Sequence, residues 1–216
     1  ISLGLVGSEM CIRDSSLAEA SVSSDSKNAG ELLWLGQLLS RSGKADRAEA
    51  ALERAVEQGP DLAETWMALF NHQFASGKRR LAEKTLERVV ETLAEPNRQL
   101  VEAQGYEMLG RLDDAEQSYR DAIAAAPADL TAARGLASFL VRRGRLTPAR
   151  DVLREMLAST DDSPGAKATK IWARRTLAQL TAEAGGYKAL EQALTILDDN
   201  TVSYTHLRAH ETEADL

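Results

Sequence analysis

The stretch Glu31–Pro60, ELLWLGQLLSRSGKADRAEAALERAVEQGP, decides the fold of this chain. On both sides of Gly43 the apolar residues recur three and four positions apart, which is the spacing of one helix face. A glycine readily adopts the left-handed conformation that closes a helix end. The stretch therefore predicts two amphipathic helices joined by a tight turn at Gly43.

The same pattern occurs four times along the chain. Its turn glycines are spaced by 34, 33 and 34 residues and are Gly43, Gly77, Gly110 and Gly144. An alanine follows each glycine five positions later: Ala48, Ala82, Ala115 and Ala149. The small side chain is expected to let two helices approach closely. A period near 34 with this content is typical of a helix-turn-helix repeat, and no stretch shows the signals of a strand.

The composition is that of an ordinary globular protein. Of the 216 residues, 44% are hydrophobic and 27% are charged. These values exclude a collagen-like, low-complexity or disulfide-scaffold protein. The net charge of −7 argues against a nucleic-acid-binding surface. No apolar run reaches the roughly 20 residues that a membrane-spanning helix needs.

The two ends of the chain are related in a way that no fold requires. When Ile1–Ser15 is paired in reverse order with residues 201–215, codons exist that make every pair reverse complements; Met10 and His206, for example, are ATG and CAT. The segments resemble a transposon-type sequencing adapter translated from both strands. A signal peptide would need a basic start and a small-residue cleavage site, and neither is present. We therefore expect residues 1–15 and 201–216 to be an adapter-derived artefact without function, and the natural protein to be longer.

Setting these ends aside changes the chemistry that the chain offers. Cys11 and two of the three histidines lie in them, so His72 is then the one histidine and no cysteine remains. A Cys/His nucleophile pair, a zinc cluster and a disulfide are thereby excluded for the rest of the chain. The compartment stays open between cytoplasm and periplasm, because cysteine usage no longer informs on it.

The repeats resemble the tetratricopeptide repeat family from Ala29 to about Asp162. Repeat one carries the family's residues in order, namely Leu32, Leu35, Gly36, Leu39, Gly43, Ala48, Leu52, Ala55 and Pro60. Repeat two departs from the pattern at Ala94, where a proline is usual, and repeat three at Glu102, where a leucine is usual. The resemblance implies an all-α fold, a right-handed α-α superhelix or solenoid. Its first helices would line a concave face and its second helices a convex one.

The repeats are one of several parts that we expect along the chain. These parts are a helix end and linker over 16–28, four repeats over 29–162 and a divergent helical hairpin over 163–200, between the two adapter-derived ends. The helices predicted for the hairpin are Ile171–Ala184 and Tyr187–Asp198, with Gly185 and Gly186 at the turn. The stretch Thr160–Thr169, TDDSPGAKAT, has the composition of a linker.

The resemblance also implies a groove for a partner protein along the first helices. Its inward positions are Leu33, Gln37, Arg41, Met67, Asn71, Phe74, Leu100, Gln104, Glu107, Arg134, Ser138 and Arg142. Relatives that bind the C-terminal carboxylate of heat-shock chaperones use a lysine and an asparagine where Leu33 and Gln37 stand here, so a chaperone-tail clamp is disfavoured.

The remaining groove residues favour a different ligand. We expect an extended or helical segment with apolar side chains, its acidic end toward Arg134 and Arg142. A competing interpretation is that Met67, Phe74 and Leu100 merely seal neighbouring helices.

No motif in the chain indicates catalysis, a cofactor or a metal site. His72 has no second histidine or cysteine to work with, so a packing or groove role is favoured over that of a base or ligand. Carboxylate pairs such as Asp113 and Asp114 are expected to cap helices rather than act as a general acid and base. The arginines between Arg142 and Arg154 lack interleaved aromatic residues, which favours a solvated turn over a nucleic-acid patch.

Two functions are compatible with these observations. The first is a non-enzymatic scaffold or adaptor that binds a peptide segment of a partner protein. The second is a substrate-recruiting or regulatory array of a larger enzyme, for example a kinase or glycosyltransferase, whose catalytic domain lies outside this chain. The identity of the partner and the oligomeric state do not follow from the sequence.

Overall fold

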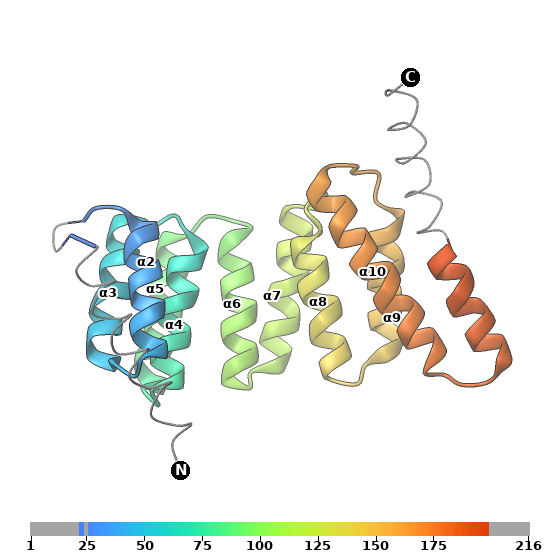
Figure 1. The fold of residues 1–216 in the computed structure, drawn as a ribbon, viewed down its shortest axis with the longest axis horizontal. Coiled ribbons are helices and arrows are strands. Elements are labelled where there is room, and N and C mark those ends of the chain that lie inside the picture. The colour runs from blue at the N-terminus through green and yellow to red at the C-terminus, as the bar shows by residue number, and fades with distance from the viewer. Residues whose placement is uncertain (1–21, 24–25, 199–216) are drawn as a thin grey trace, which may run out of the picture. The chain divides into compact units, whose positions relative to one another are not determined.

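The computed structural model of the chain describes residues 22–23 and 26–198 (Figure 1). Both segments that we interpret as adapter-derived, 1–15 and 201–216, lie outside the described residues. The helix end expected before residue 21 lies outside them as well.

Every regular element in the described part of the chain is an α-helix. The elements are α2 (Ala29–Arg41), α3 (Ala45–Gln58), α4 (Ala63–Ala75), α5 (Arg79–Thr92), α6 (Asn97–Leu109), α7 (Leu112–Ala125), α8 (Leu130–Arg142), α9 (Leu146–Ala158), α10 (Pro164–Ala182) and a last helical segment over 187–198. The chain forms two compact units that divide within α7, unit 1 ending at Ser118 and unit 2 beginning at Tyr119. The predicted all-α fold built from helical pairs is confirmed (Figure 1).

The turn glycines close the first helix of each pair as predicted. Gly43 has φ +75°, and the other three turn glycines have φ between +70° and +80°. The N–H of Lys44 donates to the carbonyl of Leu39 at 3.0 Å, the six-residue bond of a Schellman motif. The same bond recurs after each of the other three glycines. A left-handed backbone at these positions is why glycine recurs with the repeat period.

Small residues set the distance between helices in unit 1. Ala48 and Ala82 are fully buried in the second helices α3 and α5. On α2, a Cβ added at Gly36 would lie 2.6 Å from Cγ of Leu52, so α2 and α3 are in contact where the first helix has no side chain. The full burial of Ala48 and Ala82 agrees with the expectation that the recurring alanines pack between helices.

Aromatic contacts also join helices in unit 2. Tyr119 of α7 contacts Gly135 and lies with its ring centroid 5.9 Å from that of Phe139, both on α8. From α9, the guanidinium of Arg150 donates to the carbonyl of Leu180 near the end of α10 at 2.6 Å. Tyr119 thus joins α7 to α8, and α8, α9 and α10 pack against one another.

The divergent hairpin differs from its prediction at its first helix. That helix begins at Pro164, not at Ile171, so the second half of the supposed linker Thr160–Thr169 is helical. The Ser163 hydroxyl accepts the Ala166 N–H at 3.2 Å, and proline occupies the first helical position, where its missing N–H costs nothing. The Pro-Gly composition thus marks a helix start.

One tryptophan also departs from expectation. Trp34, Trp66 and Trp172 all stand in first helices of the pattern, where a tryptophan is expected to pack in the core, but Trp34 is 48% exposed. Trp66 is 2% exposed and belongs to the core of unit 1. Trp172 is half-buried on α10.

Candidate partner-binding surface

Three exposed amide side chains stand at one repeat position in the first helices of unit 1. They are Gln37 on α2, Asn71 on α4 and Gln104 on α6, each directly after the small or apolar residue that recurs in the repeat. Within the residues that the structure describes, none of the three side chains makes a hydrogen bond. An amide carries both donors and an acceptor, so a row of them offers complementary groups to a peptide backbone.

The apolar groove residues of unit 1 are half-buried. Leu33, Met67 and Phe74 all pack against the core cluster of this unit. The ring of Phe74 stacks on that of the buried Phe70, with centroids 6.1 Å apart and planes 13° apart. Part of each of these three side chains is therefore buried in helix packing, and only the exposed remainder could contact a ligand. Leu100 and Glu107 are also half-buried, whereas Arg41 is exposed.

In unit 2 the predicted groove residues lie on α8. The guanidinium of Arg134 lies over the ring of Trp172 on α10, with its carbon 4.9 Å from the ring centroid. This cation–π contact fixes the plane of the guanidinium, whose in-plane N–H groups suit a carboxylate. Arg142 is exposed at the other end of the helix and Ser138 is half-buried between them.

His72 is a buried packing residue of α4 in this structure. Its Nδ1 lies 2.9 Å from the hydroxyl oxygen of Ser40 on α2, while its Nε2 is buried and has no hydrogen-bond partner among the described residues. No cluster of three or more metal-ligating side chains occurs in the ranges 22–23 and 26–198. Over the same ranges, no helix is long and apolar enough to cross a membrane.

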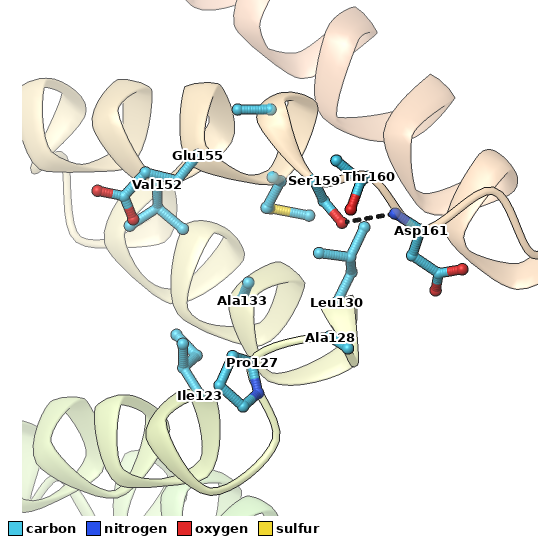
Figure 2. A pocket seen from close by; sticks show the side chains of 12 residues that line it. Ile123, Pro127, Ala128, Leu130, Ala133, Val152, Glu155, Ser159, Thr160 and Asp161 are labelled. Carbon is cyan, nitrogen blue, oxygen red and sulfur yellow. Dashed lines mark hydrogen bonds between the residues drawn. The ribbon is translucent and has the colours of Figure 1, made fainter.

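A pocket in unit 2 was not foreseen from the sequence. It has a volume of about 760 Å³ and is lined by α7, α8, α9 and the segment that follows α9 (Figure 2). Asp161 lies at one side of it and accepts hydrogen bonds from the N–H and hydroxyl of Ser163, at 2.9 and 3.1 Å. These bonds hold the pKa of the Asp161 carboxyl below its ordinary value of 3.8.

Solved structures of helical-repeat proteins resemble this chain. A tetratricopeptide repeat protein from Parabacteroides merdae is 15% identical, with 88% of this chain and 77% of that chain covered and a TM-score of 0.53. A thermophilic one from Thermus thermophilus is 22% identical, with 79% and 89% covered and a TM-score of 0.50. The Cut9–Hcn1 hetero-tetramer of the APC/C is 13% identical with a TM-score of 0.54; the match covers 86% of this chain but only 35% of that one.

At these identities the likeness shows the fold alone. No curated protein matches the chain. Family models described as tetratricopeptide repeat match residues 29–71 and 100–164, and these ranges contain the first and the last two of the four predicted repeats. The chain therefore contains tetratricopeptide repeats.

Proposed function

We propose that this chain is a scaffold that binds a peptide segment of a partner protein along the first helices of unit 1. Tetratricopeptide repeats are typical of protein–protein interaction scaffolds, which supports the general role. The groove is the finer part of the proposal, and the row of Gln37, Asn71 and Gln104 is the observation that carries it.

The chemistry of this row fits an extended peptide. A peptide backbone offers a donor and an acceptor at each residue, and its recognition by hydrogen bonds leaves the side chains to set specificity. The half-buried Leu33 and Met67 stand four residues before two of the amides and give apolar surface beside them. The expected ligand is therefore a segment with apolar side chains whose backbone bonds to the amides.

We propose that α8 of unit 2 binds acidic side chains of the same class of partner. Arg134 is held over Trp172 with its guanidinium oriented, and Arg142 adds a second positive charge on the same helix. A bidentate bond from Arg134 to a carboxylate is stronger than one from a lysine at that place would be. The chain itself is proposed to do no catalysis.

Selection of peptides followed by substitution tests the groove. Peptides that bind the full chain would be selected from a random library, and their dissociation constants measured for the wild type, Asn71→Ala and Gln104→Ala. Both variants should weaken binding with no change in melting temperature, because their side chains are exposed. Gln58→Ala on α3 is the matched control, since it removes an exposed amide from a second helix.

The outcomes separate the groove from the rest of the surface. Weaker binding for both groove variants and unchanged binding for Gln58→Ala would support the proposal. Equal effects at all three positions, or none at the two groove positions, would overturn it.

A further inference from the structure

The pocket of unit 2 has a counterpart that is filled in unit 1. Figure 2 shows the lining side chains on α7, α8, α9 and the segment after α9, with Ala133 of α8 among them. Ala133 stands four residues before Ala137, and Trp66 stands four residues before Phe70, which is the same repeat position two repeats earlier. One pair of helices therefore has a tryptophan where the other has a methyl group.

Trp66 shows how an indole occupies this position. Its ring is buried, its Nε1–H donates to the carbonyl of Pro60 at 2.8 Å, and the guanidinium of Arg88 lies over it at 5.0 Å from the ring centroid. An indole is therefore accommodated in unit 1 by an apolar cradle, one carbonyl acceptor and one charged side chain above the ring.

The cradle is repeated in unit 2. The pocket residues Ile123, Pro127, Leu130, Val152 and Met156 correspond by repeat position to Val56, Pro60, Ala63, Thr85 and Val89. Val56 and Val89 belong to the core cluster that contains Trp66, and Ala63 packs against it. Pro127 is the equivalent of Pro60, whose carbonyl accepts the indole N–H of Trp66 in unit 1. The two sites thus share their acceptor residue and most of their apolar wall, and differ in the residue that fills the centre.

The charge at the edge of the site is inverted between the two units. Glu155 stands at the repeat position of Arg88. Asp161 also lines the pocket, but its carboxylate accepts the hydrogen bonds of Ser163, and its carbonyl accepts one from the ammonium of Lys170 at 2.7 Å. The inverted charge therefore rests on Glu155. In Figure 2 these two carboxylates lie on opposite sides of the pocket. No lysine or arginine is among the residues that line it. A ligand group next to the ring would therefore be favoured if it were basic.

We propose that this pocket binds the indole ring of a tryptophan in a partner protein, next to a basic residue of that partner. The ring would lie over Ala133, as Trp66 lies in its own cradle, with its N–H directed to the carbonyl of Pro127. The basic residue would lie near Glu155, at the position that Arg88 has in unit 1. None of the predicted groove residues lines the pocket, so this site is independent of the proposed groove.

Free indole tests the cradle without a partner in hand. Indole is titrated into the full chain and its binding followed by calorimetry and by NMR shifts of the methyl groups of Ile123 and Val152. The wild type should show saturable binding. Ala133→Trp should abolish it and raise the melting temperature, because it restores the side chain of unit 1. Ala168→Trp, which adds a tryptophan at an exposed position of α10, should change neither.

A second variant keeps the test decisive if Ala133→Trp does not fold. Ala133→Leu places in unit 2 the residue that repeat one has at this position, Leu32, and should also weaken indole binding. Absence of saturable binding by the wild type overturns the proposal. Equal binding by the wild type and by the folded position-133 variant overturns it as well.

The basic neighbour is tested with two blocked dipeptides, tryptophanyl-arginine and tryptophanyl-glutamate. The wild type should bind the first more tightly, and Glu155→Arg should remove or reverse that preference while leaving indole binding in place. Equal affinities in the wild type would contradict the charge assignment.

Sedimentation of the full chain then identifies the source of the tryptophan. A monomer at all concentrations supports an external partner. Self-association that both Ala133→Trp and Trp34→Ala abolish would show that the exposed Trp34 of a second copy fills the pocket, which overturns the partner assignment.

Discussion

The Nδ1 atom of His72 lies 2.9 Å from the hydroxyl oxygen of Ser40, and this contact joins the first helices of repeats one and two. The histidine is buried and its second ring nitrogen has no partner among the described residues. The Ser40 hydroxyl is therefore the hydrogen-bond partner that the imidazole has in the described part of the chain.

Ser40→Ala should destabilise the chain by about 1–3 kcal/mol, because it leaves both ring nitrogens of a buried histidine without a partner. Chemical denaturation of the full chain gives the free energy of unfolding. The double variant Ser40→Ala with His72→Phe removes the polar group as well and should recover part of the loss. If the single variant is as stable as the wild type, the contact contributes nothing.

Added bulk at the recurring alanines should be poorly tolerated. Ala48 and Ala115 are fully buried between helices, so replacement by leucine should cost ~1–3 kcal/mol through overpacking. Ala125 is exposed at the end of α7, and its replacement by leucine should change little. Thermal melts that rank the three variants alike would show that the repeat register is wrong.

Phe74→Ala should lower stability as well as any ligand affinity. The ring stacks on Phe70 and packs on the core while part of it stays exposed, so its loss should cost about 1–2 kcal/mol. Calorimetric melting measures this. An unchanged melting temperature would mean that Phe74 belongs to the ligand surface alone.

The hydrogen bonds between the Asp161 carboxylate and Ser163 should make the free energy of unfolding depend on pH in the acid range. The folded pKa of this carboxyl is lowered by the Ser163 hydrogen bonds, so the ionised form stabilises the folded chain. That contribution is present above about pH 4 and is lost as the pH falls through the folded pKa. The wild type should melt higher than Asp161→Ala at pH 7, and the difference should shrink at pH values well below 4. A difference that stays constant into strong acid would exclude the carboxylate as its origin.

Three features could be predicted from the sequence: the repeat period, the turn glycines and the buried small residues between helices. Each depends on one residue type at a fixed position in the repeat. Gly43 needs a left-handed backbone and Ala48 needs a missing side chain, and both are visible in one sequence. The start of α10 was misread because Ser163, Pro164 and Gly165 have the composition of a loop, while their order is that of a helix cap.

Features that depend on what packs above a residue were not predictable. Trp34 is a large apolar residue in a first helix, which is typical of a core position, yet about half of its surface is exposed in the described part of the chain. The pocket over Ala133 arises from an ordinary alanine on a helix. The sequence does show that Ala133 shares its repeat position with Trp66. This difference indicates a pocket only when the side chains around both residues are known from the structure.

The side-chain amide resonances of Gln37, Asn71 and Gln104 test the central claim most directly. In a two-dimensional NH spectrum of the full chain, addition of a selected peptide should shift these three signals together and leave that of Gln58 on α3 in place. Shifts confined to residues of the second helices, with the three amide signals unmoved, would contradict a peptide-binding groove on the first helices of unit 1.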